Sequence, residues 1–453
     1  MLNIKIDSRK VVSGDTFVAI KGNTVDGHNY IKEAINNGAS KIICEYGNYD
    51  VETIIVKDTK EYLKDYLVNN YSNEFSSLKL IGVTGTNGKT TTCFLTYQIL
   101  NKLGIKTCYI GTIGCYVNDE KIELSNTTPD ILELYNLLIY AKESNCEVVV
   151  MEVSSHSLVE QRIEGLKFDV CAFTNLTQDH LDFHKTMKDY CDAKVKIISY
   201  LKDNGKIIVN VDDEYSNNFI CDKSLSLGEK ATDYKIVDYN LSNTYTDIAF
   251  LCENNKYEIR TNLIGKFNVY NYLTSLSLIN KLGINIMDIF KVTNDIYAPV
   301  GRAEIIRVDN SIAVIDYAHT PDAVSKIISS FKEVTKGKII TIVGCGGDRD
   351  PKKRPIMGNI ATDNSDYVIF TNDNPRCEDE KNIMQDILEG VNKDNYKVIY
   401  DRKEAIKEGL NLLKDNDTLL ILGKGHEDYQ IIGREKTHLS DKEEVYKYIN
   451  KAY

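Results

Sequence analysis

The chain has 453 residues, of which 42% are hydrophobic and 27% charged, and 55 Lys and Arg against 66 Asp and Glu give a net charge of −11. This is ordinary globular composition, with apolar material for about two to four domains of roughly 100–200 residues. The acidic balance excludes nucleic-acid or anionic-membrane binding as the main role, although a small site can still be locally positive and bind an anion.

No segment has the pattern of a membrane anchor or a leader. The N-terminal residues MLNIKIDSRK contain no apolar stretch, and no apolar run reaches the roughly 18 residues that a membrane helix needs. The 11 cysteines include no Cys-x-x-Cys pair, which argues against a zinc or redox motif. We therefore expect a cytoplasmic protein with reduced, mostly buried thiols.

Short β-rich runs alternate with helical patterns along the whole chain, which predicts an α/β fold. We divide it into a small α/β domain at 1–76, a central domain with a mainly parallel sheet at 77–301, and a doubly wound, Rossmann-like domain at 302–453. The first domain contains a predicted helix at Tyr30–Asn36. The predicted strands are Thr16–Ile20, Ser40–Cys44, Thr53–Val56, Leu78–Thr84, Glu147–Val153, Phe168–Thr174, Lys206–Asn210, Ser311–Asp316, Lys338–Val343, Asp366–Thr371, Lys397–Tyr400 and Thr418–Leu422.

A glycine-rich segment, Gly85–Thr91, links the strand that ends at Thr84 to a helix that runs to Leu103. Glycines let backbone N–H groups curl around phosphate oxygens, and the helix N-terminus adds partial positive charge. The strict GxxxxGK[ST] pattern fails, because Val83 occupies the first glycine position. The alternative is a plain strand-to-helix turn, but the Lys-Thr pair after the last glycine favours a phosphate loop.

Three further segments contain side chains that could bind metal or take part in catalysis. Glu152 ends an apolar strand, the loop Thr174–His184 brings together two His and two Asp, and Tyr190-Cys191-Asp192-Ala193-Lys194 follows. A carboxylate at the carboxyl end of a strand near a phosphate loop is well placed to hold Mg²⁺. From the residues alone, a solvated polar loop and an exposed helix lysine at 194 remain open alternatives.

The segment TGTNGKTTT resembles the ATP loop of the Mur ligases, the ATP-dependent amide-forming enzymes of peptidoglycan synthesis. YCDAK, GKFNVYN, GR and DYAHTPD resemble further motifs of that family, so the resemblance covers the whole chain. It implies a monomeric enzyme with ATP and Mg²⁺, in which Lys89, His180 and Lys194 are catalytic. Magnesium ligands are implied at Thr90, Glu152, His180 and a carbamylated Lys194. ATP contacts are implied at Gly85, Thr86, Asn87, Gly88, Lys89, Thr90, Thr91, Asn268, Asn271, Arg302 and Asp316.

The acceptor implied by the resemblance is UDP-N-acetylmuramoyl-L-alanyl-D-glutamate. The run Asp7-Ser8-Arg9 looks like the uridine-binding first domain of the members that add the third residue. Arg162 makes physical sense as the partner of the D-Glu carboxylate, which it can bind through two parallel hydrogen bonds. The acceptor contacts implied are Ser8, Thr127, Thr128, Ser154 and Arg162.

The amino acid implied is meso-2,6-diaminopimelate, because Asp373-Asn374-Pro375-Arg376 resembles the DNPR motif of ligases that add it. Diaminopimelate carries a second carboxylate that lysine lacks; an Arg can bind this group, whereas lysine would leave that Arg unpaired. Glu427 is expected to hold the distal ammonium. The full set implied is Arg349, Asp373, Asn374, Pro375, Arg376, Gly423 and Glu427.

The expected reaction forms an acyl phosphate on the D-Glu γ-carboxylate, which the amino group of diaminopimelate then attacks. A lysine-adding ligase of the same family is the nearest alternative. More distant ones are a folylpolyglutamate or cyanophycin synthetase, and a binding protein that uses ATP as a switch. A kinase is less favoured, because no kinase catalytic-loop pattern occurs.

Overall fold

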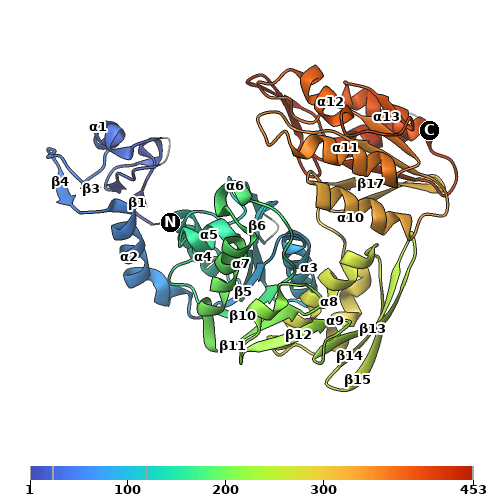
Figure 1. Cartoon of the computed structure of the whole chain (residues 1–453). Helices are drawn as coiled ribbons and strands as arrows, with labels where there is room; N and C mark the ends of the chain where they lie inside the picture. The colour runs from blue at the N-terminus through green and yellow to red at the C-terminus, as the bar shows by residue number, and fades with distance from the viewer. Residues whose placement is uncertain (1, 23–24, 119, 451–453) are drawn as a thin grey trace. The chain divides into compact units, whose positions relative to one another are not determined.

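The computed structural model describes residues 2–22, 25–118 and 120–450. The ends of the first and third predicted domains, residue 1 and residues 451–453, lie outside the described residues. By its internal contacts the chain forms two compact units, one of residues 1–81 and 105–169 and the other of residues 82–104 and 170–453. The fold is α/β, as the alternation of patterns predicted (Figure 1).

The N-terminal part of the first unit is a four-stranded parallel sheet in the order β1-β2-β3-β4. Its apolar face packs on the first helix, with Phe17, Ile31 and Ile42 in one buried cluster. Asp58 starts the second helix by accepting hydrogen bonds from the N–H groups of the first turn. The elements are β1 (Ile4–Lys5), β2 (Thr16–Val18), α1 (Ile31–Asn36), β3 (Lys41–Cys44), β4 (Glu52–Ile55) and α2 (Thr59–Tyr71), with 3-10 helices at Ser8–Lys10, Gly27–Tyr30 and Ser72–Phe75.

A sheet of 11 strands follows, in the order β15-β14-β13-β12-β11-β10-β5-β9-β6-β7-β8. Its first-unit elements are β6 (Thr107–Gly111), β7 (Gly114–Val117), β8 (Glu120–Ile122), α4 (Ile131–Glu143), β9 (Val148–Glu152) and α5 (Ser155–Val159), and β5 (Lys79–Thr84) spans the division between units. Strand β10 (Phe168–Phe173) also spans the division. The second unit contributes α3 (Lys89–Lys102), α6 (Leu181–His184), α7 (Met187–Val195), β11 (Leu201–Asn210), β12 (Ser224–Gly228), β13 (Tyr234–Leu241), β14 (Thr246–Cys252), β15 (Asn255–Thr261), α8 (Lys266–Lys281) and α9 (Ile286–Val292), with 3-10 helices at Lys196–Tyr200, Ser216–Phe219 and Thr293–Asp295.

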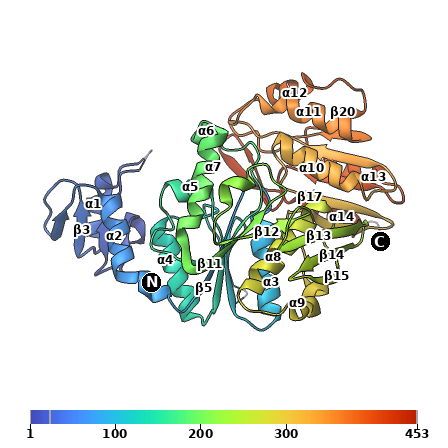
Figure 2. The ribbon, with the colours of Figure 1, turned by 60° about the horizontal axis from the view of Figure 1, so that its bottom comes forward.

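Helices α3 and α8 lie side by side and are buried along most of their length (Figure 2). A helix that is covered on all sides shows no single apolar stripe, and both sequences mix Thr and Ser with large apolar residues. The buried hydroxyls pair with one another, since Thr96 Oγ1 lies 3.0 Å from Ser275 Oγ. The helix that starts at the glycine-rich segment is therefore anchored in the interior.

The C-terminal sheet has the order β16-β17-β21-β18-β19-β20, and all its strands are parallel except β16. One face packs on α10, α11 and α12 and the other on α13 and α14, which confirms the doubly wound, Rossmann-like prediction. The elements are β16 (Glu304–Val308), β17 (Ser311–Asp316), α10 (Pro321–Lys332), β18 (Ile339–Val343), α11 (Lys353–Asn364), β19 (Tyr367–Phe370), α12 (Glu380–Leu388), β20 (Tyr396–Val398), α13 (Arg402–Leu412), β21 (Thr418–Leu422), β22 (Tyr429–Ile432), β23 (Glu435–His438) and α14 (Asp441–Ile449).

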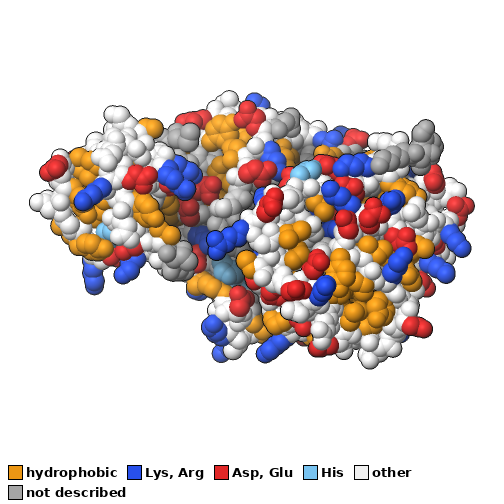
Figure 3. All heavy atoms as spheres, turned by 90° about the horizontal axis from the view of Figure 1, so that it is seen from above, with side chains coloured by type: hydrophobic (Ala, Val, Ile, Leu, Met, Phe, Trp, Pro, Cys, Tyr) orange, Lys and Arg blue, Asp and Glu red, His pale blue; other side chains and the backbone are white. Residues whose placement is uncertain are grey.

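The surface and the thiols agree with the composition. Acidic and basic side chains are interspersed over the face drawn in Figure 3, rather than gathered into a basic patch. Within the described residues no helix is long and apolar enough to cross a membrane. All 11 cysteines are free thiols, with Cys377 exposed, Cys221 partly buried and the others buried.

Candidate active site

The segment Gly85–Thr91 forms a loop and the first turn of α3, between β5 and that helix. Gly85 and Gly88 have φ angles of 147° and 87°, which residues with a side chain rarely adopt. A Cβ at Gly85 would also collide with the Thr174 hydroxyl, and one at Gly88 would lie 2.5 Å from Asn271 Oδ1. Gly88 is the N-cap residue of the 14-residue helix α3 and makes no side-chain hydrogen bond to its first turn. A helix N-terminus of this kind, at the end of a glycine-rich loop, is typical of phosphate-binding sites.

The loop after β10 holds the phosphate loop in place. Thr174 Oγ1 donates to the carbonyl of Asn87 at 2.6 Å, and the Asn175 amide donates to the same carbonyl at 3.0 Å. In return, the backbone N–H of Asn87 donates to Asn175 Oδ1 at 2.9 Å. These reciprocal bonds satisfy backbone groups of the loop and fix its conformation.

Two lysines converge on the carbonyl of Gly85. Lys89 Nζ donates to it at 2.8 Å and to the Thr86 carbonyl at 2.8 Å, and Lys194 Nζ donates to the Gly85 carbonyl at 2.8 Å. Lys194 is only 1% exposed, so the alternative of an exposed helix lysine is excluded. Burial and then the nearby Lys89 ammonium lower the pKa of Lys194 well below its usual value.

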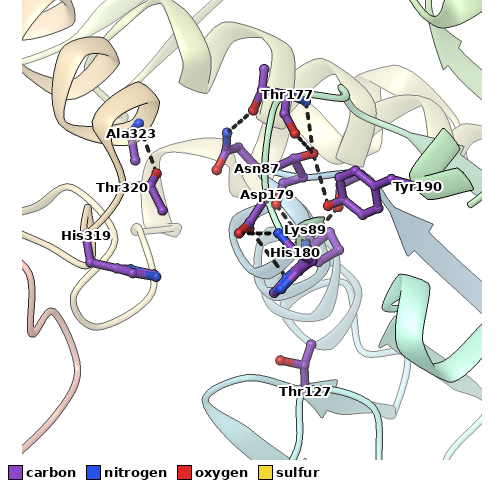
Figure 4. Close-up of polar contacts among 12 residues, drawn as sticks. Asn87, Lys89, Thr127, Thr177, Asp179, His180, Tyr190, His319, Thr320 and Ala323 are labelled. Carbon is purple, nitrogen blue, oxygen red and sulfur yellow. Dashed lines mark hydrogen bonds and ion pairs between the residues drawn. The ribbon is translucent and has the colours of Figure 1, made fainter. Parts of the chain in front are cut away.

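Tyr190 and His180 lie on the same side of the loop as Lys194. The Tyr190 hydroxyl is 3.2 Å from Thr86 Oγ1, and the Lys194 ammonium lies 4.6 Å from the centre of the Tyr190 ring. The ring centres of His180 and Tyr190 are 6.1 Å apart, and Figure 4 shows both residues with Asp179. His180 has a left-handed φ of 53° and a side chain that is 47% exposed, with Nε2 3.4 Å from Asp179 Oδ2. An exposed imidazole beside a phosphate loop can reach a ligand.

The two asparagines predicted to contact ATP, Asn268 and Asn271, lie on α8. Asn268 and Asn271 are 2% and 7% exposed, and the Asn271 amide donates to Asn268 Oδ1 at 3.1 Å. Asn271 also lies against Gly88, as the collision above shows. In this structure Asn271 supports the phosphate loop at Gly88, and Asn268 accepts the hydrogen bond of the Asn271 amide.

In the first unit, Glu152 is fully buried at the end of β9. Its Oε1 accepts from the Tyr109 hydroxyl at 2.7 Å and from the N–H of Thr112 at 2.8 Å, while Oε2 accepts from the Thr112 hydroxyl at 3.2 Å. A side chain at Gly111 would collide with this carboxylate. Glu152 is therefore held in one orientation by its neighbours.

Of the residues predicted to bind the acceptor substrate, all except Ser8 lie around Thr128. Thr128 Oγ1 donates to the carbonyl of Glu152 at 2.8 Å, and its own carbonyl accepts from Arg162 Nη1 at 2.8 Å. The N–H of Ser154 donates to Thr128 Oγ1 at 3.0 Å, and Thr127 Oγ1 lies 3.0 Å from the Thr112 hydroxyl. Ser8 is not part of this group, since it donates to Glu33 in the N-terminal sheet region at 2.9 Å.

Most of the remaining predicted residues lie at or just after the carboxyl ends of β17, β18, β19 and β21, where ligands bind in open α/β sheets. Arg302 instead precedes β16, which runs antiparallel to β17. Asp316 accepts from the N–H groups of Ala303 and Ala318 at 2.7 and 2.8 Å. Burial raises the pKa of Asp316, and the Arg302 guanidinium opposes the rise. Arg302 lies over the Tyr317 ring at 4.8 Å, and its Nε is buried without a hydrogen-bond partner in the described part of the chain, which suits an anionic ligand.

The DNPR loop after β19 meets the loop after β21. The Asn374 amide donates to Glu427 Oε2 at 2.9 Å, and a Cβ at Gly423 would lie 2.6 Å from Asp373 Oδ2. Arg376 has a φ of 53° and donates through Nη1 to the carbonyl of Gly347 at 2.7 Å. The sheet order thus brings Asn374, Gly423 and Glu427 together, although about 50 residues of sequence separate them.

Two other residues of the predicted pocket differ in exposure. Arg349 is exposed and donates to the carbonyl of Asp348 at 3.3 Å, so it lies at the rim. Pro375 is buried, and its carbonyl packs so closely on Gly347 that a side chain there would collide with it.

Two residues near these sites, Lys424 and Asp322, were not predicted from the sequence. Lys424 is fully buried and contacts both Asn374 and Glu427 at 3.3 and 3.1 Å, and the pattern that could have indicated it is a lysine between two glycines directly after an apolar strand. Asp322, in the first turn of α10, accepts from Thr177 Oγ1 at 3.0 Å and from the Asn87 amide at 3.3 Å. It ties the C-terminal part of the second unit to the phosphate loop.

Three family models match the chain. They are the Mur ligase family catalytic domain at residues 2–74, the Mur ligase middle domain at residues 83–279 and the Mur ligase glutamate ligase domain at residues 301–425.

Relatives and solved structures agree with these models. UDP-N-acetylmuramoyl-L-alanyl-D-glutamate–2,6-diaminopimelate ligases of Clostridium botulinum and Fusobacterium nucleatum are 41% and 42% identical, covering 98% and 97% of this chain and 94% and 92% of the relatives. A solved structure of a ligase of that name is 30% identical with a TM-score of 0.70, covering 99% of this chain and 94% of its own. The MurF ligase of Thermotoga maritima in complex with ADP shares the fold, at 20% identity and a TM-score of 0.72 over 100% of this chain and 99% of its own. The chain belongs to the Mur ligase family.

Proposed function

We propose that this chain is the ATP-dependent ligase that joins meso-2,6-diaminopimelate to the D-Glu γ-carboxylate of UDP-N-acetylmuramoyl-L-alanyl-D-glutamate. The products are an amide, ADP and phosphate, and the reaction belongs to the synthesis of peptidoglycan precursors. Relatives named for this activity match at about 40% identity over nearly their whole length. Because ATP and UDP-linked sugars are cytoplasmic, the proposal includes a cytoplasmic location.

We assign diaminopimelate as the amino-acid substrate mainly because the DNPR loop contacts Glu427. Asn374 holds Glu427 at 2.9 Å, and Arg376 follows Asn374 by two residues in the same loop. A carboxylate and a guanidinium on two loops that meet suit a ligand head with one ammonium and one carboxylate. The distal end of diaminopimelate has this chemistry, whereas lysine ends in an ammonium alone.

For ATP, we assign the phosphates to the loop Gly85–Thr91, with the N–H groups at the start of α3 and the Lys89 ammonium as donors. The N–H groups of Thr86 and Asn87 instead donate to Asn175 and hold the loop in place. Arg302 and Asp316 are assigned to the nucleotide as well, and the buried, unpaired Nε of Arg302 supports this assignment. Asn268 and Asn271 are proposed to serve the adenine side while supporting Gly88.

Magnesium is proposed at Thr90, Glu152, His180 and Lys194. No three His, Cys, Asp or Glu side chains cluster as metal ligands in the described residues, so the set fits only if Lys194 supplies an oxygen. The lowered pKa of the buried Lys194 favours its neutral amine, which adds CO₂ and releases a proton to become an anionic carbamate. Bound Mg²⁺ would neutralise the charge of the reacting phosphoryl group.

In the proposed mechanism, Thr127, Thr128, Ser154 and Arg162 orient the muramoyl dipeptide, with Ser8 on the uridine portion. The D-Glu γ-carboxylate attacks the γ-phosphorus of ATP and ADP leaves, which gives an acyl phosphate. Lys89 stabilises the charge on the transferred group, and His180 positions the acyl phosphate. The amino group at the L-centre of diaminopimelate then attacks the acyl carbon, and phosphate leaves as the amide forms. We propose a monomer with domains at 1–76 for the UDP-sugar, 77–301 for ATP and 302–453 for the amino acid.

The experiment that tests this function is phosphate release by the purified protein with ATP and Mg²⁺. Release is expected only when both the acceptor and meso-diaminopimelate are present. Equal or faster release with L-lysine in place of diaminopimelate would overturn the assigned amino acid. Release of phosphate with ATP alone, without amide product, would support the ATP-switch alternative instead.

A further inference from the structure

Lys424 is a buried cation inside the loop that carries Glu427. It is the second residue after β21, its side chain is 0% exposed, and Nζ lies 3.1 Å from Glu427 Oε2. The same ammonium donates to Asn374 Oδ1 at 3.3 Å and lies 5.3 Å from the centre of the Tyr429 ring. A lysine is almost never buried this completely unless its charge is compensated.

Both protein donors to Glu427 converge on one of its two oxygens. Lys424 Nζ and the Asn374 amide bind Oε2, at 3.1 and 2.9 Å. Within the described residues Oε1 accepts no hydrogen bond, and the Glu427 side chain is 14% exposed. Since an ionised carboxylate can accept several hydrogen bonds on each oxygen, Oε1 is the atom available to a ligand ammonium.

The charges around this point balance. Asp373 and Glu427 are anionic, and Lys424 and Arg376 are cationic, so the four side chains sum to zero. After burial, the Glu427 carboxylate raises the pKa of Tyr429, Arg376 opposes the rise, and Asp373 and Asp428 add to it. The exposed Asp428 and the exposed Lys436, whose ammonium lies 3.7 Å from the Tyr429 ring, have opposite charges and leave the sum at zero. A neutral pocket suits a ligand head that is itself neutral overall, with one ammonium and one carboxylate.

We propose that Lys424 is a positioning and specificity-determining residue, which holds Glu427 Oε2 so that Oε1 faces the ligand ammonium and which keeps the pocket neutral. Without its charge the pocket carries one net negative charge, which favours a purely cationic side chain such as that of lysine over the zwitterionic head of diaminopimelate. This inference rests on the proposed function, because it assigns the amino-acid substrate to these loops.

The test compares kcat and KM for meso-diaminopimelate and for L-lysine in the wild type, Lys424→Met and Lys424→Gln. Lys424→Met is expected to raise KM for diaminopimelate and to lower the ratio of the two kcat/KM values, diaminopimelate over lysine, by about tenfold or more. KM for ATP should stay within about twofold. Lys424→Gln keeps a donor for Glu427 without the charge, so its specificity ratio should fall as well, while KM for diaminopimelate rises less.

Lys436→Met is the matched control, because Lys436 lies over the same Tyr429 ring at 3.7 Å but on the exposed strand β23. Its specificity ratio should equal that of the wild type. Should Lys424→Met fail to fold, as judged by circular dichroism, the Lys424→Gln ratio decides. A ratio unchanged in a folded Lys424 variant overturns the role of Lys424 alone, whereas a wild-type enzyme that adds neither amino acid overturns this inference and the proposed function together.

Discussion

Lys194 beside the phosphate loop and Lys424 beside the DNPR loop are both almost fully buried, at 1% and 0% exposed, but their surroundings differ in charge. Lys194 donates to a backbone carbonyl and lies near a second ammonium, so its pKa falls. Lys424 instead forms an ion pair with Glu427. The comparison teaches that burial alone does not decide what a lysine does: a repelled amine can become a nucleophile toward CO₂, whereas a paired ammonium organises its carboxylate.

The largest expected effect is on activity. Lys194→Met removes the carbamate that we propose as an oxygen ligand, so kcat should fall by more than about a hundredfold. Added bicarbonate should not restore it, because methionine has no amine. The exposed neighbour Lys196 provides the control, since Lys196→Met should retain wild-type kcat. Near-normal turnover of a folded Lys194→Met protein would remove the carbamate from the mechanism.

Arg402 is a third buried cation, and its ion pair with Asp441 should affect the free energy of unfolding. Arg402 and Asp441 are both 0% exposed and form a bidentate pair, Nε to Oδ1 and Nη2 to Oδ2, each at 2.7 Å. Arg402→Met leaves the Asp441 charge buried and uncompensated, which should lower the free energy of unfolding by about 3–5 kcal/mol.

The control for that pair is Arg260 with Asp247, which has the same bidentate geometry on the surface. Arg260→Met should lower stability far less, because water and salt already screen an exposed pair. Urea unfolding of the two variants measures the difference. Equal losses would mean that burial does not set the value of these ion pairs.

Arg376→Ala tests the cation that we propose binds the substrate carboxylate, in contrast to Lys424, which we propose positions Glu427. Loss of a charge-assisted hydrogen bond worth about 1.5–3 kcal/mol should raise KM for diaminopimelate about ten- to hundredfold. KM for ATP should not change. Arg434→Ala, on the exposed turn after β22, is the matched control. An unchanged KM for diaminopimelate in Arg376→Ala would take Arg376 out of the pocket.

The smallest expected effect is a pH dependence of stability. The folded-state pKa of Lys194 lies below the ordinary 10.5, so between these two values the unfolded chain binds a proton that the folded chain does not. Stability contributed by this site therefore rises with pH through that window and is lowest at neutral or lower pH. In CO₂-free buffer without Mg²⁺, the difference in Tm between pH 9 and pH 7 should be more positive for the wild type than for Lys194→Met. Parallel pH profiles would show that the pKa of Lys194 is not lowered.

Much of the fold followed from local patterns. The strands Ser311–Asp316 and Thr418–Leu422 were predicted with the bounds that the structure has, because each is a continuous apolar run that ends in turn residues. The antiparallel strands β13, β14 and β15 were missed, since their alternation of buried and exposed residues mixes Tyr, Lys and Asn and gives no long apolar run. Strand β11 begins five residues earlier than predicted, at Leu201.

The site was less accessible to sequence reasoning than the fold. The glycine-rich loop is local, so its motif was readable, but the burial of Lys194 depends on how α7 packs on that loop. Likewise, Asn374 and Glu427 meet because β19 and β21 are the two neighbours of β18, and no periodicity in the sequence encodes strand order. Lys424 went unrecognised for the same reason.

The most direct test of the central claim is the identity of the amino acid in the product. The protein is incubated with ATP, Mg²⁺, UDP-N-acetylmuramoyl-L-alanyl-D-glutamate and equal concentrations of meso-diaminopimelate and L-lysine, and the product is measured by mass spectrometry. The account predicts a product that contains diaminopimelate almost exclusively. A product that contains mainly lysine would contradict it.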